Sequence, residues 1–189
     1  MKYDPKKHHR RSIRLKGYDY CQVGAYFVTI VTQDRVCLFG AVVDGEMRLN
    51  DAGRMVAQCW QQIPAHFPHV ELDEFVMMPN HVHGIIIVVG ARHAVPLPER
   101  FGKPVSGSLP TIIRSFKSAA TKRINELRGT TGTRVWQRNY YEHIIRDEQS
   151  WDRIREYIVN NPLQWELDRL NPNVGPGLPL PRGNEPWRM

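Results

Sequence analysis

The sequence predicts an α+β fold in which an antiparallel or mixed sheet carries helices mainly on one face. Residues 25–35 are apolar on both faces of an extended segment, as expected for a strand buried on both sides. In some segments apolar residues occur at every second position, as in strands, and in others they recur every three to four residues, as in helices. Such a mixture of strands and helices, without internal repeats, is typical of one α+β domain.

A hairpin and a helix are expected after this first strand. Asp44 and Gly45 stand between two short apolar runs and are typical of a tight hairpin turn. Asn50 or Asp51 can then cap a helix, whose apolar residues recur at helical spacing as far as Pro64.

Two adjacent strands are expected at residues 70–78 and 81–89, joined by a turn at Pro79 and Asn80. Period-two alternation in the first of them predicts that one side carries Val70, Leu72, Val76 and Met78. The second strand opens with two histidines and continues as an apolar run.

A loop, two helices and a further strand complete the predicted domain. Residues 90–109 are rich in proline and glycine and predict the loop. Residues 110–127 place apolar side chains on one helical face and basic ones on another, and residues 134–146 have the composition of a strand. Asp147 can cap the last helix, whose inward-facing residues are Trp151, Ile154, Tyr157 and Ile158. This order favours the ferredoxin-like arrangement.

Charge is unevenly distributed along the chain. The formal net charge of +7 is concentrated in residues 1–20 and 99–146, whereas residues 21–98 are acidic. We expect a basic N-terminal arm at 1–20, a folded domain at 21–167 and a proline-rich, extended or disordered tail at 168–189. The basic segments favour a polyanionic partner, nucleic acid first and an anionic membrane surface second.

Cysteine usage and hydrophobicity exclude several classes of protein. Cys21, Cys37 and Cys59 form no CxxC pair, which argues against a disulfide framework or a structural zinc site and favours the cytoplasm. The longest apolar run, residues 85–89, is far shorter than the ~20 residues of a membrane helix. Neither a signal peptide nor a membrane span is expected.

The two histidines suggest a metal site. Side chains of a strand alternate between faces, so His81 and His83 point the same way, with β-carbons roughly 7 Å apart. Such a pair can hold one divalent ion and leave positions for substrate oxygens and water. The alternative is a pair of hydrogen-bonded histidines at the end of a strand. Beside two basic segments, a metal suggests phosphodiester chemistry.

A nucleophile has to come from elsewhere in the chain. There is no GxSxG motif, and Tyr140 and Tyr141, between Arg138 and His143, are the candidates. Because the pKa of a tyrosine is ordinarily ~10, the attacking hydroxyl needs a base, a metal or nearby cations. The alternative for the tyrosine pair is cross-strand aromatic packing.

Three segments resemble the REP-associated tyrosine transposases, a branch of the single-tyrosine HUH transposases in the insertion-sequence-200-like superfamily. They lie within residues 11–163 and read SIRLKGYDY with GAYFVTIVTQDR, MPNHVHGIIIV, and VWQRNYYEHIIRDEQSWDRIREYIVNNP. The resemblance implies a single HUH endonuclease-type domain that cuts single-stranded DNA by tyrosine attack. It further implies a 5′-phosphotyrosine intermediate, a free 3′-hydroxyl, a divalent cofactor, Mg²⁺ or Mn²⁺, and hairpin-forming repeat DNA as substrate.

The resemblance also implies roles for individual residues. His81 and His83 match the metal ligands, and Tyr140 matches the nucleophile of the family's Trp-Gln-x-x-Tyr segment, with Tyr141 beside it as an alternative. Many relatives carry a glutamine four residues after the tyrosine as a third metal ligand, but Ile144 stands at that distance from Tyr140.

The third metal ligand therefore remains open in the sequence. His143 is the expected ligand if it lies on the same side as Tyr140, and Glu142 is a carboxylate alternative if the segment is extended. The alternative role for His143 is an ordinary hydrogen bond or a phosphate contact.

The expected partner is single-stranded or hairpin DNA, bound by a monomer or a homodimer. Basic side chains of the arm and of the second half of the chain are expected to contact phosphates: Arg10, Arg11, Arg14, Lys16, Arg114, Lys117, Lys122 and Arg138. Tyr3, Tyr18 and Tyr20 are candidates for stacking on unpaired bases. Two other functions stay open, a catalytically inactive ferredoxin-like nucleic-acid-binding module and a small-molecule metalloenzyme.

Overall fold

The computed structural model describes residues 18–90 and 105–174. The strands are β1 (Gly24–Val31), β2 (Gly40–Val43), β3 (Glu46–Leu49), β4 (Val70–Met78), β5 (His81–Val88) and β6 (Tyr141–Ile145). The helices are α1 (Asp51–Gln61), α2 (Ile63–His66), α3 (Leu109–Arg128) and α4 (Glu148–Asn160), with short 3₁₀ turns η1 (Gln33–Arg35) and η2 (Pro162–Leu167).

The central sheet has the strand order of a ferredoxin-like fold. Its four strands lie in the order β4-β5-β1-β6 and are antiparallel throughout. The chain forms two β-α-β units, β1-α1-β4 and β5-α3-β6. Their strands interleave, so that β5 lies between β1 and β4, and β1 lies between β5 and β6. The predicted α+β class is confirmed, and β2 and β3 form the separate hairpin expected at Asp44 and Gly45.

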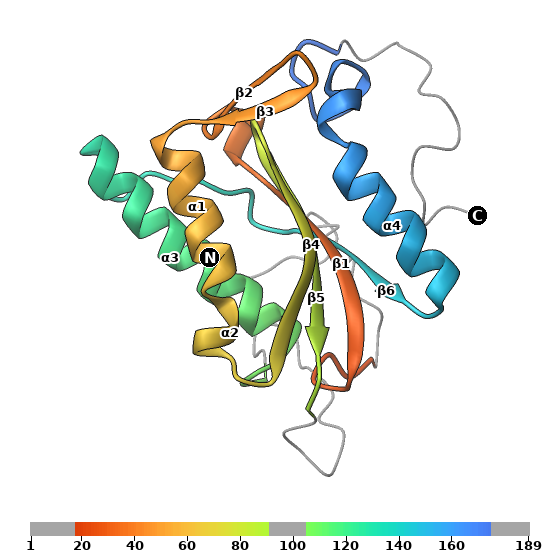
Figure 1. Ribbon diagram of the computed structural model, residues 1–189. Helices are drawn as coiled ribbons and strands as arrows, with labels where there is room; N and C mark the ends of the chain where they lie inside the picture. The colour runs from red at the N-terminus through yellow and green to blue at the C-terminus, as the bar shows by residue number, and fades with distance from the viewer. Residues whose placement is uncertain (1–17, 91–104, 175–189) are drawn as a thin grey trace, which may run out of the picture.

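Helices cover both faces of this sheet, as Figure 1 shows. On one face, α1 and α3 contribute buried residues such as Trp60 and Phe116 to the larger hydrophobic core. On the other face, α4 contributes Ile154 and Ile158 to a smaller core that includes Phe27 of β1. Most helices thus share one face, as predicted, and α4 alone among the described helices closes the other.

A β-bulge in β4 changes which residues face each core. Pairing with β5 shifts between Leu72 and Phe75, and Leu72 packs with the larger core whereas Val76 packs with the smaller one. The prediction that Val70, Leu72, Val76 and Met78 share one side is therefore wrong, because a bulge inserts a residue and resets the alternation. Asp73 lies within this bulge.

Side-chain caps start the two helices for which they are predicted. The Asn50 side chain accepts a hydrogen bond from Gly53 N, and Asp147 accepts one from Ser150 N. Each cap satisfies a backbone N–H that has no partner within the first turn of a helix. Both predicted caps are confirmed.

The packed domain extends beyond the predicted boundaries of 21 and 167. Tyr20 is 2% exposed and belongs to the larger core, and Asn171 is buried at the other end. The remainder of the predicted arm, residues 1–17, and of the tail, residues 175–189, lies outside the described residues.

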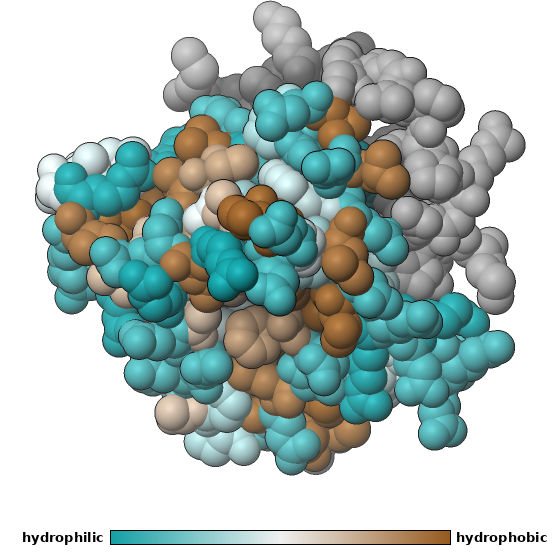
Figure 2. Space-filling view, turned by 45° about the horizontal axis from the view of Figure 1, so that its top comes forward, coloured by the Kyte–Doolittle hydropathy of each residue, from teal (hydrophilic) through white to brown (hydrophobic). Residues whose placement is uncertain are grey.

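The surface is mixed in polarity. On the face that Figure 2 shows, hydrophobic side chains form several patches separated by hydrophilic ones. The exposed large hydrophobic residues include Val43, Val159, Leu163 and Leu167. Among the helices that the structure describes, none has the length and apolar character needed to cross a membrane.

Candidate active site

His81 and His83 open strand β5 and point to the face of the sheet that α4 covers. They are 0% and 2% exposed. Their Nε2 atoms lie 3.0 Å apart, and the rings meet edge to face with centroids separated by 4.5 Å. The alternation of a strand therefore brings two imidazole nitrogens to one point.

Each imidazole is oriented through its other nitrogen. His81 Nδ1 lies 2.8 Å from Oδ1 of Asn80, and His83 Nδ1 lies 2.9 Å from the hydroxyl oxygen of Thr29. A neutral histidine that donates through Nδ1 keeps its lone pair on Nε2, as a metal-binding imidazole requires. The Asn80 amide thus favours a His81 Nε2 that can bind a cation, and the Thr29 hydroxyl, which can donate or accept, is compatible with the same tautomer of His83.

Asp168 adds a carboxylate to this pair. Its Oδ2 lies 3.8 Å from His81 Nε2, and one ligand atom from each of the three residues lies within 4.8 Å of the others. Asp168 follows η2, in the segment that the sequence assigns to the tail. The sequence gives no sign of this role for Asp168, because nothing in the local pattern shows that this segment folds back onto the sheet.

Asn161 is a further candidate ligand, at the C-terminal cap of α4. Its side chain is buried, and its Oδ1 has no hydrogen-bond partner among the described residues. Leaving such a group unsatisfied costs about 1–3 kcal/mol, and the Asn161 side chain interacts with the ring of His81. A buried amide oxygen beside two imidazoles and a carboxylate is a donor set that fits a divalent cation.

Burial keeps both histidines neutral. It lowers the pKa of His81 to about 3, against a smaller opposing interaction with Asn161. It also lowers the pKa of His83 well below its usual value; the charge that a protonated His81 would carry and the charge of Arg169 act in the same direction. Burial raises the pKa of Asp168, because a low-dielectric site disfavours an isolated carboxylate. A cation would relieve this penalty.

Tyr157 of α4 reaches the same site. Its hydroxyl lies 3.3 Å from His83 Nε2, and its ring contacts those of His83 and Phe27 with centroid distances of 5.2 and 6.1 Å. The sequence predicts that Tyr157 faces inward but assigns it no chemical role. The missed signal is Asn161 four residues later, since residues four apart share a helix face.

The structure does not bring Tyr140 to the histidines. Its side chain packs with the larger core on the opposite face of the sheet, where the Lys117 ammonium lies 5.8 Å from the centre of its ring. Tyr141 lies on the histidine face, but Thr29 of β1 is the cross-strand neighbour of both Tyr141 and His83 and so stands between them.

His143 is also separated from the candidate metal ligands His81, His83 and Asp168. It pairs with Phe27 on the edge strand β6, and the group of convergent ligand atoms contains Asp168 in its place. Burial, with the nearby charge of Arg146, lowers the pKa of His143. Glu142 pairs with Val28, a residue of the larger core, and therefore faces away from the histidines.

A carboxylate in the bulge of β4 holds α4 in position. Asp73 accepts a hydrogen bond from the indole N–H of Trp151, and its Oδ2 lies 2.9 Å from Nε and 2.8 Å from Nη2 of Arg155. Trp151 and Arg155 are one helical turn apart, so the contacts restrict both the rotation and the translation of α4. Tyr157 follows Arg155 by two residues.

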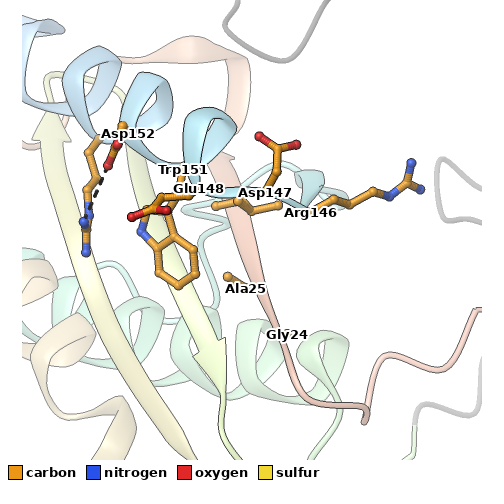
Figure 3. Close-up of a pocket in the computed structure, with 9 residues that line it drawn as sticks. Gly24, Ala25, Arg146, Asp147, Glu148, Trp151 and Asp152 are labelled. Carbon is orange, nitrogen blue, oxygen red and sulfur yellow. Dashed lines mark ion pairs between the residues drawn. The ribbon is translucent and has the colours of Figure 1, made fainter.

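A separate cavity of about 430 Å³ lies where α4 begins. Figure 3 shows Trp151 below the helix, near Ala25 and Gly24 of β1. The Arg146 side chain extends away from Trp151 in this view. Neither a histidine of the pair nor Tyr157 lines this cavity.

Four of the eight predicted DNA-contact residues lie in the described part of the chain, and three of these four are exposed. Arg114, Lys122 and Arg138 are exposed, and the two on α3 lie on the side of the sheet opposite the histidines. Lys117 instead donates to the backbone carbonyls of Gln137 and Asn139, and burial lowers its pKa to about 8. The predicted contacts of the arm, Arg10, Arg11, Arg14 and Lys16, lie outside the described residues.

The predicted stacking tyrosines are only partly available. Tyr20 is buried in the larger core, and its ring packs edge to face against that of half-buried Tyr18. This burial removes Tyr20 as a stacking surface. Tyr3 lies outside the described residues.

Known proteins provide two sequence relatives. No protein-family model matches the chain. An uncharacterized protein of Haemophilus influenzae is 47% identical over 179 residues, which cover 89% of this chain and 97% of that protein, and the two belong to one family. Another protein of that organism, named "Putative REP-associated tyrosine transposase", is 26% identical over 154 residues, or 77% of this chain and 74% of the relative. This chain is a distant relative of the REP-associated tyrosine transposases.

A REP-associated tyrosine transposase is also among the similar solved structures. It was solved bound to a REP hairpin, is 22% identical, and has a TM-score of 0.47 over 82% of this chain and 72% of its own. The relationship to REP-associated tyrosine transposases that three sequence segments predict is confirmed by the sequence relative.

Proposed function

We propose that the protein is a metal-dependent single-stranded DNA endonuclease and strand transferase, a transposase, with Tyr157 as its nucleophile. The observation that carries the proposal is the 3.3 Å distance between the Tyr157 hydroxyl and His83 Nε2. A hydroxyl beside convergent, neutral imidazoles is placed for attack on a phosphate held at the same point. Tyr157 therefore replaces Tyr140 as the proposed nucleophile, and His143 is replaced as the third ligand.

The proposed metal ligands are His81, His83 and Asp168, with Asn161 as the fourth. They offer two neutral nitrogens, one carboxylate oxygen and one amide oxygen, a set compatible with Mn²⁺ and with the harder Mg²⁺. A bound divalent ion would polarise a phosphoryl oxygen of the substrate as a Lewis acid.

Thr29 allows His83 to change tautomer when it binds a ligand. Without a cation, only one of the two Nε2 atoms 3.0 Å apart can donate to the other. If His81 donates from Nδ1 to Asn80, then His83 donates from Nε2 to His81. In the metal-free protein, where His83 carries its proton on Nε2, the Thr29 hydroxyl can donate to His83 Nδ1. When His83 binds a metal through Nε2 and carries its proton on Nδ1, the same hydroxyl can accept, because a hydroxyl is both donor and acceptor.

The proposed reaction conserves the phosphodiester bond energy. The Tyr157 hydroxyl loses its proton and its oxygen bonds to phosphorus, while the bond from phosphorus to the 3′-oxygen of the preceding nucleotide breaks. The departing 3′-oxygen gains a proton, so protons and charge balance. A new 3′-hydroxyl can reverse these steps and join the strand without ATP.

Hairpin-forming repeat DNA is the proposed substrate. The name of the Haemophilus relative and the REP hairpin bound to the similar solved structure support this class of DNA. The basic character of residues 99–146, which include exposed Arg114 and Lys122, supports a phosphate-binding surface.

A covalent-adduct assay tests the proposal. The protein is incubated with Mn²⁺ or Mg²⁺ and a labelled single-stranded hairpin from the DNA that flanks its gene, then separated under denaturing conditions. We expect an adduct with the wild-type protein, none with Tyr157→Phe, and adduct within about threefold of wild type with Tyr140→Phe and Tyr141→Phe, since each keeps its ring packing.

Two outcomes would contradict the proposal. An adduct that persists in Tyr157→Phe and disappears in Tyr140→Phe would restore the nucleophile predicted from the sequence. Salt-sensitive hairpin binding by the wild type without any metal-dependent adduct would favour the inactive binding module.

A further inference from the structure

The side chain of Asn80 lies at the junction of three separate parts of the chain. It is fully buried in the turn between β4 and β5. Its Nδ2 donates to the carbonyl of Arg35 at 2.9 Å and to that of Leu170 at 2.7 Å, and its Oδ1 accepts from His81 Nδ1 at 2.8 Å. Both amide protons and the amide oxygen are therefore in use.

These contacts determine the tautomer of His81. Two backbone carbonyls can only accept, so the atom that faces them has to be the amide nitrogen. The amide oxygen then faces His81 Nδ1, and a neutral His81 has to carry its proton there. Its lone pair is left on Nε2, the atom that faces His83 and Asp168.

The same amide holds the segment that supplies Asp168. Leu170, whose carbonyl Asn80 binds, donates its backbone N–H to Asp168 Oδ1 at 2.6 Å. The other carboxylate oxygen, Oδ2, is the one that approaches His81 Nε2. One side chain thus positions two of the proposed ligands, one by a direct bond and one through Leu170.

The loop of η1 is shaped to complete this arrangement. Asp34 and Arg35 have φ values of 55° and 57°, in the left-handed region that residues other than glycine rarely adopt. In this conformation Arg35 offers its carbonyl to Asn80, while its Nη1 donates to the carbonyl of Arg169 at 3.0 Å. Backbone strain of this kind persists where surrounding contacts require it.

We propose that Asn80 is a positioning residue that couples docking of residues 168–171 to the metal-binding tautomer of His81. The inference rests on the proposed metal centre. Docking of the segment places the Leu170 carbonyl against Asn80, which fixes the orientation of the amide and keeps the His81 proton on Nδ1. Undocking removes Asp168 and one of the two contacts that orient the amide.

Asn80→Asp keeps the acceptor for His81 and removes the donor to the carbonyls of Arg35 and Leu170, and so separates these two functions of the side chain. The carboxylate still accepts from His81 Nδ1, but it donates to neither carbonyl. In metal-free protein, we expect backbone amides at 168–171 to exchange with deuterium at least about tenfold faster, with β1 and β5 unchanged. Direct titration should show Mn²⁺ affinity about 10–100-fold weaker, and Asp168→Ala should weaken it little further in the Asn80→Asp background.

Two more variants sharpen the test. Asn50→Asp is the matched control, because the Asn50 amide also donates to a backbone carbonyl, that of Leu38, yet serves the start of α1; exchange at 168–171 and Mn²⁺ affinity should stay within twofold of wild type. Asn80→Ser removes both carbonyl contacts without adding charge and carries the test if Asn80→Asp does not fold. In it, ¹⁵N chemical shifts should report loss of the single His81 tautomer.

The outcomes distinguish the coupling from the metal centre. Unchanged exchange at 168–171 together with unchanged Mn²⁺ affinity in Asn80→Asp or Asn80→Ser would overturn the coupling, as would independent effects of Asn80→Asp and Asp168→Ala. Absence of Mn²⁺ binding by the wild-type protein would overturn the proposed centre itself.

Discussion

The Tyr157 hydroxyl and His83 Nε2 lie 3.3 Å apart although 74 residues separate them in the chain. The contact joins helix α4, which covers one face of the sheet, to β5, the strand that carries both histidines. In the proposed reaction, this hydroxyl and the proposed metal-binding nitrogen mark the point at which a phosphate would be attacked. The position of α4 on the sheet therefore determines that Tyr157 meets the histidines.

Removal of Asn161 or Asp168 side chains should weaken metal binding. We expect Asn161→Ala and Asp168→Ala each to lower Mn²⁺ affinity by at least about tenfold, measured by isothermal titration, because each removes an oxygen from the proposed donor set. His143→Ala serves as the control and should change the affinity less than twofold. A large loss of Mn²⁺ affinity in His143→Ala, with none in Asn161→Ala and Asp168→Ala, would identify His143 as the third ligand instead.

Stability of the metal-free protein should fall in mild acid. The unfolded histidines have a pKa near 6.5, whereas burial lowers the pKa of His81 to about 3 and that of His83 well below 6.5. Below pH ~6.5 the unfolded chain binds more protons than the folded one, so stability present above this pH is lost as pH falls, by roughly 1 kcal/mol per pH unit for each histidine. Asp168, whose pKa burial raises, opposes this trend at the acid end.

Urea unfolding from pH 4.5 to 7.5 measures this slope. The matched variant carries His81→Asn and His83→Gln, which cannot titrate, and its stability should vary less with pH. An equal slope in the variant and the wild type would show that other groups cause the acid sensitivity.

Loss of the Asp73 carboxylate should loosen α4. Asp73→Ala removes the acceptor for Trp151 and Arg155, and we expect a loss of about 1–3 kcal/mol in the free energy of unfolding. The rate of adduct formation at saturating DNA should fall more than hairpin affinity, because Tyr157 is carried by the same helix. Asp152→Ala is the control, since Asp152 lies 3.9 Å from Arg155 at the surface, and it should cost less than about 0.5 kcal/mol.

A methyl group at Gly84 should destabilise the sheet. A Cβ there would lie 2.4 Å from Cζ2 of Trp60 and 3.0 Å from Cβ of Phe75, and Trp60 is fully buried in the larger core. We expect Gly84→Ala to lower the free energy of unfolding by about 1–3 kcal/mol, as for other overpacked cores. Gly24→Ala, whose Cβ would meet only ordinary contacts with Tyr26, should change stability little in the same urea titration.

Local patterns are sufficient for much of the fold. Cap chemistry identifies the starts of α1 and α4 at Asn50 and Asp147, and nearly continuous apolar runs identify β1 and β5. These features depend on neighbours a few residues apart, so the sequence displays them directly. The bulge at Asp73 does not follow from such a pattern, because an inserted residue shows itself only through pairing with another strand.

Local sequence is enough to show that His81 and His83 share one face at the start of an apolar strand, since alternation is a property of the strand alone. It also carried the three segments that relate the chain to REP-associated tyrosine transposases. Which tyrosine meets the histidines depends on how distant elements pack. The sequence predicts Tyr140 as the nucleophile and gives Tyr157 only an inward-facing position on its helix. In the folded protein, Tyr140 packs on the face of the sheet opposite the histidines and α4 brings Tyr157 to their face, because packing between distant elements selects the face.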